Sequence, residues 1–326
     1  MKKAIITGAT GFIGSALARK LLSKNIEVLA LGRKSWNEVD PKRLAKSKGL
    51  TYIQVDMSEI ETLPEKIKEL GWNSGDSCIF YNFAWGGISG LSDLDIEAQL
   101  NNVSWSANAV EAASKLNCKK FVHVGTMEEA FAKKYLSLDF RKDNQYNRHV
   151  IHSVSKMMAR NVLKVISNQN NIDLIIASNS HVMGPNDYRD SFLRVTLVKL
   201  INNDDLEFSS GEQMFDVISV YDCATAYMKI GEFGKPGSEY WIGSGKPRPL
   251  KEYVKIMANL YPSDKQLKFG SLPYNDISLT REDFSTTSLT NDTGFKVSHE
   301  YEDIVHQVHS WLTKNKLTDE KTLLEY

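Results

Sequence analysis

The stretch HSVSK contains two residues whose types and spacing suit proton transfer. His152 and Lys156 are four residues apart, so a helix would carry both on one face. A neutral imidazole can accept a proton or donate a hydrogen bond, and a nearby lysine cation favours this neutral form. A second stretch, VGTMEEA, carries a hydroxyl at Thr126 and carboxylates at Glu128 and Glu129. Chemistry that involves both stretches requires a fold that brings them together.

Short apolar runs alternate with helix-period segments through the first two thirds of the chain. The runs are rich in β-branched and aromatic residues, as in strands buried on both faces of a sheet. Between them lie amphipathic segments such as ALARKLLSK and SKMMARNVLKVISN. This alternation predicts an α/β fold with a Rossmann-type, doubly wound parallel sheet. The expected strands are Lys3–Thr7, Glu27–Leu31, Thr51–Val55, Cys78–Asn82, Lys120–Val124 and Asp173–Ser178.

The pattern changes after about Gly184, where Gly and Pro become more frequent and short helical segments follow. We expect a dinucleotide-binding Rossmann domain over residues 1–183, to which a segment around 215–235 returns. Residues 184–326 then form mainly a smaller α/β substrate-binding lobe over the carboxyl edge of the sheet, where open α/β folds bind ligands. The tail TDEKTLLEY is expected to dock loosely.

The first predicted strand runs directly into GATGFIG, with glycines at Gly8, Gly11 and Gly14, and then into a helical segment. Glycines let the backbone amides of such a turn approach a pyrophosphate closely, and the start of the helix adds a favourable dipole. The position of these glycines between a strand and a helix predicts a dinucleotide site.

The end of the second predicted strand indicates which dinucleotide. A carboxylate there usually binds the ribose 2′-hydroxyl of NAD. Here the strand ends in Leu31-Gly32 and is followed by Arg33 and Lys34, which suit a 2′-phosphate. We therefore expect NADP(H) to be preferred, with NAD(H) as the alternative, and Asp56 to reach the adenine amino group.

The overall composition excludes several classes of function. Forty basic and forty acidic residues balance, which argues against a nucleic-acid binder or a polybasic membrane anchor. The chain lacks an apolar run long enough for a transmembrane helix. Cys78, Cys118 and Cys223 are widely spaced and form no metal-binding pattern. We expect a cytoplasmic protein with structural thiols and no bound metal.

The motifs in order along the chain resemble the extended short-chain dehydrogenase/reductase family, in particular its nucleotide-sugar epimerases, dehydratases and 4-ketoreductases. TGATGFIG is similar to the family's phosphate loop, YNFAWGG to the segment along the cofactor, and HSVSK to its Tyr-x-x-x-Lys segment. VGTMEEA, HVMGP, FDVISVYDCATAY, YWIGSGKPRPLKEY and NDTGF resemble later landmarks of the family.

The resemblance implies roles for the candidate catalytic residues. Thr126 takes the place of the hydroxyl that binds the reacting oxygen, and Lys156 that of the lysine that holds the nicotinamide ribose. His152 stands where the family has its tyrosine, so it is either an adapted acid/base or a residue at a lost catalytic position. Glu128 takes the place of the dehydratase base.

The resemblance also implies two sets of binding residues. The cofactor contacts would come from Gly8, Thr10, Gly11, Phe12, Ile13, Gly14, Arg33, Lys34, Asp56, Met57, Ala84, Asn102, Lys156, Asn179 and Val182. The substrate contacts would come from Trp85, Met127, His181 and Arg248. The partner would be a nucleotide sugar, and the family usually forms a homodimer through helices that here correspond to Ala98–Leu116 and Ser153–Asn168.

Departures from the family pattern gather at the substrate side. Met127 replaces the aspartic acid of the dehydratases and cannot donate a proton, which disfavours 4,6-dehydration. His181 and Met183 replace an asparagine and a tyrosine, and Phe215 replaces an arginine that binds the nucleotide phosphates. Tyr146 is ten residues before Lys156, a spacing that does not fit one helix face.

Three functions remain open at this point. The first is an NADP(H)-dependent reductase of a 4-keto nucleotide sugar. The second is an epimerase or dehydratase that retains its dinucleotide through the reaction. The third is a non-catalytic dinucleotide-binding sensor or partner protein.

Overall fold

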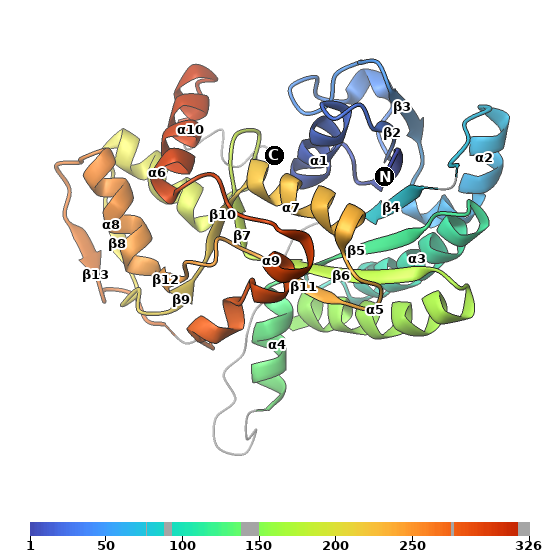
Figure 1. Ribbon diagram of the computed structural model, residues 1–326. Helices are drawn as coiled ribbons and strands as arrows, with labels where there is room; N and C mark the ends of the chain where they lie inside the picture. The colour runs from blue at the N-terminus through green and yellow to red at the C-terminus, as the bar shows by residue number, and fades with distance from the viewer. Residues whose placement is uncertain (76, 88–92, 138–149, 275–276, 319–326) are drawn as a thin grey trace.

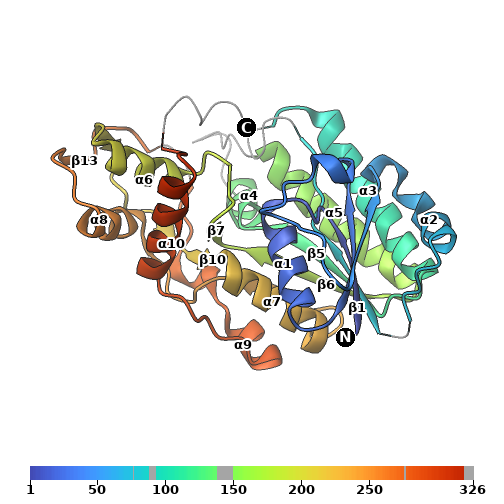
Figure 2. The ribbon, with the colours of Figure 1, turned by 90° about the horizontal axis from the view of Figure 1, so that it is seen from above.

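The computed structural model describes residues 1–75, 77–87, 93–137, 150–274 and 277–318. Tyr146 and nearly all of the C-terminal tail lie outside the described residues. The described chain forms a parallel sheet covered by helices on both faces, with a smaller lobe at one end (Figures 1 and 2). The fold is therefore the doubly wound, Rossmann-type α/β fold that the strand–helix alternation predicts.

The sheet has seven strands in the order β11-β6-β5-β4-β1-β2-β3, all parallel. From β1 the chain adds β2 and β3 on one side of the sheet, and from β4 it adds β5 and β6 on the other side. The strand order therefore reverses between β1 and β4, and the crevice at their carboxyl ends is the switch point where such folds bind ligands. The strands are β1 (Lys3–Thr7), β2 (Glu27–Gly32), β3 (Leu50–Gln54), β4 (Cys78–Asn82), β5 (Lys120–Thr126), β6 (Asp173–Asn179) and β11 (Glu239–Ile242).

Apolar strand residues fill the core on both sides of the sheet. One buried cluster joins β1 and β2 to α1 and α7, and a second joins the opposite face to α2, α3 and α5. These helices and the short one after β5 are α1 (Phe12–Leu22), α2 (Leu63–Glu69), α3 (Ile96–Lys115), α4 (Glu128–Leu136), α5 (Val150–Gln169) and α7 (Val220–Phe233). Short 3-10 helices are η1 (Trp36–Glu38) and η2 (Met57–Thr62).

The lobe has a hydrophobic cluster of its own, drawn from Met183 and later residues. Its segments are β7 (His181–Met183), α6 (Phe192–Asn202), β8 (Leu206–Phe208), β9 (Met214–Phe215), β10 (Val217–Ser219), β12 (Arg248–Pro249), α8 (Leu250–Leu260), β13 (Leu267–Phe269) and α10 (Tyr301–Lys314). Between β13 and α10, η4 (Arg281–Phe284) and α9 (Thr287–Thr293) return to the main sheet, where they pack near β11 and α7. Helix α7 returns to the main sheet, whereas the proposed domain boundary at residue 183 stays a prediction.

The six predicted strands all form, with small differences at their ends. β1 and β4 match the expected ranges, and β3 lies one residue earlier. β5 continues to Thr126 and β6 to Asn179, because their ladder pairs as far as Thr126 with Asn179. Among the described residues, no helix has both the length and the hydropathy to cross a membrane.

Candidate active site

The turn between β1 and α1 can form only because its residues are small. Gly8 has φ +64°, a left-handed conformation that favours glycine. A Cβ on Gly14 would lie 2.3 Å from the carbonyl oxygen of Gly8. Gly11 caps the start of α1 without a side chain. The turn therefore leaves backbone amides and the positive end of the α1 dipole open to an anion.

A cavity of about 410 Å³ opens at this turn, over the carboxyl ends of β1, β2, β3 and β4. Its position at the switch point and over the glycine turn suits a dinucleotide. Of the expected cofactor and substrate residues, its wall contains Gly8, Thr10, Gly11, Arg33, Asp56, Met57, Ala84 and Trp85.

The remaining expected cofactor residues lie behind or beside this wall. Phe12 and Gly14 are buried in the first turn of α1, Ile13 packs against the core, and Lys34 is exposed on the loop after β2. Asn179 ends β6, where its Oδ1 accepts a hydrogen bond from the Tyr227 hydroxyl at 2.7 Å. Val182 is buried in β7.

Arg33 and Asp56 face the same end of the cavity with different freedom. Asp56 caps η2, and its Oδ1 accepts hydrogen bonds from Ser58 N at 2.9 Å and Ser58 Oγ at 2.8 Å. These bonds hold the pKa of Asp56 below its ordinary value, so the group is an engaged carboxylate. Arg33 is exposed, and its guanidinium is available to a ligand phosphate.

Asn102 acts on the cavity from behind by fixing the loop after β4. Its Oδ1 accepts from Gly86 N at 2.6 Å, and its Nδ2 donates to Gly86 O at 2.9 Å. Gln99, which the sequence did not single out, accepts from Trp85 Nε1 at 2.8 Å and is fully buried. The polar face of α3 thus sets the position of Trp85.

Lys156 is a buried cation beside the cavity. Its Nζ donates to Val124 O at 2.9 Å and lies 3.8 Å from the centre of the Trp85 ring. Only 6% of the residue is exposed, and this burial lowers the pKa of Lys156 to about 7, with the Glu129 carboxylate acting in the opposite direction. Lys156 can therefore gain or lose a proton near neutral pH.

His152 meets Lys156 at the same aromatic ring. The buried His152 ring lies 6.0 Å from that of Trp85, edge to face at 75°. Because Trp85 also lines the cavity, it joins the cavity to both residues of the HSVSK stretch. The structure brings these three predicted residues together.

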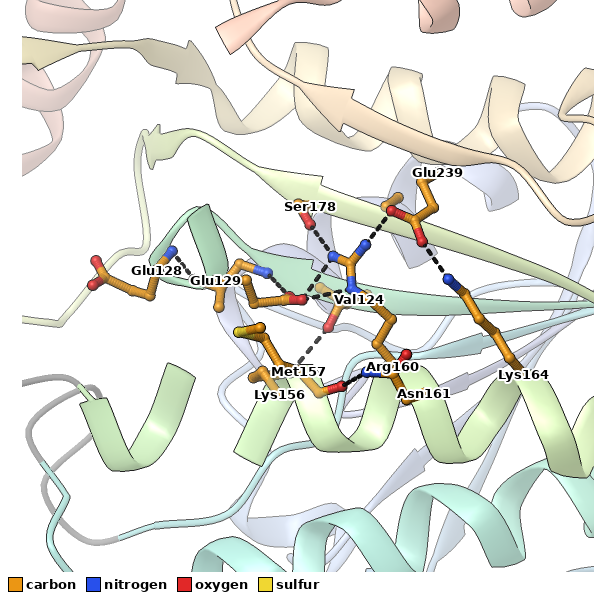
Figure 3. A network of polar contacts seen from close by, with 12 residues as sticks. Val124, Glu128, Glu129, Lys156, Met157, Arg160, Asn161, Lys164, Ser178 and Glu239 are labelled. Carbon is orange, nitrogen blue, oxygen red and sulfur yellow. Dashed lines mark hydrogen bonds and ion pairs between the residues drawn. The ribbon is translucent and has the colours of Figure 1, made fainter. Parts of the chain in front are cut away.

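The carboxyl end of β5 carries the other predicted catalytic residues. Thr126 is half-buried, and its Oγ1 accepts a hydrogen bond from Glu128 N at 3.3 Å. Met127 N donates to Asn179 O at 3.1 Å, which fixes this end to β6. The Glu128 and Glu129 carboxylates point in different directions, with Glu129 toward Arg160 and Glu128 away from it (Figure 3).

The two expected substrate residues of the lobe lie near one another. The His181 ring is 5.4 Å from that of Phe215, and burial lowers the pKa of His181 to about 4, helped by the Arg189 cation. Arg248 pairs with Phe215 between β12 and β9, and its guanidinium lies 5.2 Å from the Tyr253 ring centre. Both belong to elements other than those that carry His152 and Lys156.

His123 is a site residue that the sequence reasoning missed. It is 1% exposed in β5, its Nδ1 is 3.3 Å from Asn82 Nδ2, and its ring is 6.4 Å from that of Trp85. Burial, with the Lys156 and Arg160 cations, holds the pKa of His123 well below its usual range, so the ring is neutral. A histidine inside the apolar run KFVHV was the available signal.

The geometry of a metal centre is not seen in the described part of the chain, where no group of three or more His, Cys, Asp or Glu converges. What the described residues do form is a glycine turn, a cavity at the switch point, and a buried lysine and histidine that meet at the Trp85 ring on the cavity wall.

Comparison with known proteins gives a consistent result. The chain is 23% identical over 292 residues to CDP-abequose synthase of Salmonella muenchen, covering 89% of this chain and 91% of that protein. Among solved structures, the Bordetella bronchiseptica enzyme WbmF in complex with NADH superposes with a TM-score of 0.77 at 16% identity, covering 99% and 95% of the two chains. The UDP-glucose 4-epimerase of Thermotoga maritima with UDP-glucose gives 0.75 at 15% identity, covering 96% and 99%.

The family is shown by a model that matches most of the chain. Residues 4–243 fit the model described as the NAD dependent epimerase/dehydratase family, and this range contains the glycine turn, the cavity wall, Thr126, His152 and Lys156. The chain belongs to the NAD-dependent epimerase/dehydratase family of enzymes.

Proposed function

We propose that this enzyme reduces the 4-keto group of a nucleotide-activated sugar with NADPH. The observation that carries the proposal is the buried Lys156, with a pKa of about 7, held beside His152 and Trp85 at the edge of the cavity. The similarity to CDP-abequose synthase and to a UDP-glucose 4-epimerase supports a nucleotide sugar as the substrate class.

In this proposal the cavity holds a nicotinamide dinucleotide. The amides of the Gly8–Gly11 turn and the start of α1 would hold the pyrophosphate, and Thr10, Met57 and Ala84 would line the nucleoside parts. Arg33 would bind a 2′-phosphate, since Gly32 rather than a carboxylate ends β2. The NADH bound to WbmF keeps NAD(H) as the alternative.

The chemistry that a bound dinucleotide supplies is hydride transfer. The residues of this chain handle the accompanying proton. Thr126 donates a hydrogen bond to the carbonyl oxygen, and His152 gives its ring N–H proton to that oxygen as the hydroxyl forms. Lys156, which exchanges protons near neutral pH, holds the ribose and replaces the proton that His152 gives up, so that the imidazole stays neutral.

The substrate nucleotide belongs in this proposal to the lobe of residues 184–326, and the dinucleotide to residues 1–183. His181 and Arg248 would contact the diphosphate, with Met127 and Trp85 against the sugar. Met127 supports reduction over dehydration, because a thioether cannot protonate a leaving hydroxyl. A retained cofactor with epimerisation is the alternative, and turnover without net loss of NADPH distinguishes it.

We also propose a cytoplasmic homodimer. The exposed face of α5 carries Val154, Met158 and Val165, which are 38%, 47% and 57% exposed. Neighbouring α3 exposes Ile96 and Leu100. Apolar side chains at this spacing form one stripe on each helix, and a second copy of the chain would cover it. The free thiols Cys78, Cys118 and Cys223 support a reducing compartment.

A thermal-shift panel tests binding first. A ligand that binds only the folded state raises the unfolding midpoint, and we expect NADPH to raise it more than NADH, with a further rise on adding a nucleotide diphosphate sugar. The panel also includes Lys156→Met, which should respond less to the dinucleotide than wild type because it lacks the group that holds the ribose. A dinucleotide response with none to any nucleotide sugar would favour the non-catalytic alternative.

A further inference from the structure

A line of charged side chains crosses from the surface to the end of β5 (Figure 3). Lys164 Nζ donates to Glu239 Oε1 at 2.8 Å, and the other oxygen of Glu239 pairs with Arg160 Nη1. Arg160 Nε then donates to Glu129 Oε2 at 2.7 Å, and Arg160 Nη2 forms an ion pair with the same oxygen at 2.7 Å. Lys156, Arg160 and Lys164 stand one helical turn apart on α5, so one helix face presents all three cations.

The inner end of this line is deeply buried. The side chains of Arg160 and Glu129 are 9% and 3% exposed. Gly125 provides the space, because a Cβ there would lie 2.4 Å from Ser178 Oγ and 2.7 Å from Glu129 Oε1. Ser178 Oγ accepts a further hydrogen bond from Arg160 Nη2 at 3.2 Å. A buried ion pair adds little net stability over apolar packing, so stability alone does not account for this arrangement.

Each residue of the buried pair lies next to a candidate catalytic residue, Glu129 to Thr126 and Arg160 to Lys156. Glu129 Oε1 accepts the backbone N–H of Thr126 at 2.9 Å. Arg160 is one turn from Lys156, whose Nζ binds Val124 O on the same strand. The pair therefore connects the strand end that carries Thr126 to the helix that carries His152 and Lys156.

We infer that Glu129 and Arg160 are positioning residues for the proposed reaction, on which this inference rests. The Glu129 carboxylate fixes Thr126 at the end of β5, and its charge favours the protonated form of Lys156, against burial. Glu129 is thus a fixed counter-charge, not a base that touches the substrate.

The charges around Lys156 give the direction of the effect. Glu129 from α4, His123 from β5 and the Trp85 ring act on it directly. Arg160 follows one turn later on α5, and His152, one turn earlier, meets the same Trp85 ring. His123 is neutral, so Glu129 is the anion that offsets burial. Removing that anion makes the protonated lysine less favourable, and Lys156 then loses its proton at lower pH.

The test follows the titration of Lys156 without substrate or cofactor. Protein labelled with ¹³Cε-lysine is titrated by NMR, and Lys156→Met assigns the resonance. We expect Glu129→Gln to lower the titration midpoint of Lys156 by about one pH unit. The matched control is Glu239→Gln, which removes a carboxylate from the same guanidinium at its half-exposed outer end and should leave the midpoint close to the wild-type value.

A second variant is measured as well, because Glu129→Gln leaves the buried Arg160 with one counter-charge fewer and this loss could prevent folding. The double variant Glu129→Gln/Arg160→Met leaves no unpaired charge, but it also removes a cation near Lys156, so it should lower the midpoint of Lys156 less than Glu129→Gln does. An unchanged midpoint in folded Glu129→Gln, an equal shift in Glu239→Gln, or a larger drop in the double variant than in Glu129→Gln overturns the inference. If the Glu129 variants show the expected shifts but the wild-type protein reduces no 4-keto nucleotide sugar, the proposed function is contradicted and the positioning role is not.

Discussion

Lys156 is the residue on which the chemistry of the site most depends. Its ammonium group has one carbonyl oxygen and one indole ring as close partners in a buried place. The indole face attracts a cation, yet burial still lowers the pKa of Lys156 from 10.5 to about 7. A lysine with such a pKa is suited to exchanging a proton at neutral pH.

This shift predicts how stability depends on pH. Between pH 7 and 10.5 the unfolded chain keeps a proton on Lys156 that the folded chain has lost. The unfolded state binds more protons in that window, so stability rises with pH across it, and the full penalty of the buried cation applies below pH 7. In urea unfolding, the stability of wild type relative to Lys156→Met should rise by up to about 1.4 kcal/mol per pH unit. Lys119→Met, at an exposed site, is the control. If the difference in unfolding free energy between wild type and Lys156→Met did not change with pH, the lowered pKa of Lys156 would be contradicted.

Arg33 predicts the choice of dinucleotide. A guanidinium at the cavity edge forms an ion pair with a 2′-phosphate, whereas NADH offers it only a neutral 2′-hydroxyl. Arg33→Ala should weaken NADPH binding by about tenfold or more and leave NADH nearly unaffected, as measured by calorimetry. Lys34→Ala, at the next residue but outside the cavity wall, should have a smaller effect. Equal losses for both dinucleotides would show that Arg33 does not read the 2′ position.

At the scale of elements, bonds between the ends of strands and helices fix the position of the strand that carries Thr126. Lys120, the first residue of β5, shows how: its buried Nζ donates to Gly234 O at 2.7 Å and Gly231 O at 3.2 Å. These carbonyls end α7, where a cation also complements the helix dipole. The bond joins α7 to the strand that carries Thr126.

Removing this cap should therefore weaken the attachment of α7 to the sheet. Lys120→Met keeps the stem of the side chain but leaves buried carbonyl oxygens without a donor, and we expect a loss of roughly 1–3 kcal/mol in the free energy of unfolding. Lys119→Met, one residue earlier and exposed, should cost less than about 0.5 kcal/mol. Similar losses in chemical denaturation of the two variants would rule out the capping role.

The glycine turn gives a second prediction for an element. A Cβ on Gly14 would press on the Gly8 carbonyl at 2.3 Å, whereas one on Gly11 would lie at 3.1 Å from it. Gly14→Ala must push α1 away from the turn, so it should lower stability by roughly 1–3 kcal/mol and abolish dinucleotide binding. Gly11→Ala should be milder in stability. The reverse order in thermal unfolding would contradict this packing.

The sequence predicted these elements well and their side-chain partners poorly. The strands, the glycine turn and the HSVSK helix each follow from local patterns. Glu129 and Arg160 are 31 residues apart, and their pairing depends on the register of β5 with β6 and on the rotation of α5. Sequence reasoning instead grouped Glu129 with possible substrate chemistry. The place of Trp85 over Lys156 depends likewise on Gln99 and Asn102 from α3.

At the scale of the whole molecule, the α3–α5 face is the surface that a second copy would cover. Met158 lies within the apolar stripe of α5. Met158→Glu should convert a dimer to a monomer in analytical ultracentrifugation, because it brings like charges together in an apolar contact. Phe233→Glu alters an equally exposed apolar residue on α7, on the opposite face of the sheet, and should leave the assembly unchanged. A wild-type monomer at micromolar concentration would exclude the dimer.

The whole molecule combines a dinucleotide cavity at the switch point of the sheet with a lobe that follows β7. The proposed reaction needs both, because the sugar must meet the dinucleotide beside Thr126, His152 and Lys156. The central claim is that a hydride reaches C4 of the sugar while this group supplies the proton.

The most direct test is isotope transfer from NADPH deuterated at its hydride position to a nucleotide-linked 4-keto-6-deoxy sugar. We predict one NADPH oxidised for each sugar reduced, with deuterium at C4 of the product by NMR, and loss of this transfer in His152→Ala and Thr126→Ala. Sugar turnover with no net oxidation of NADPH, or full activity in His152→Ala, would contradict the account.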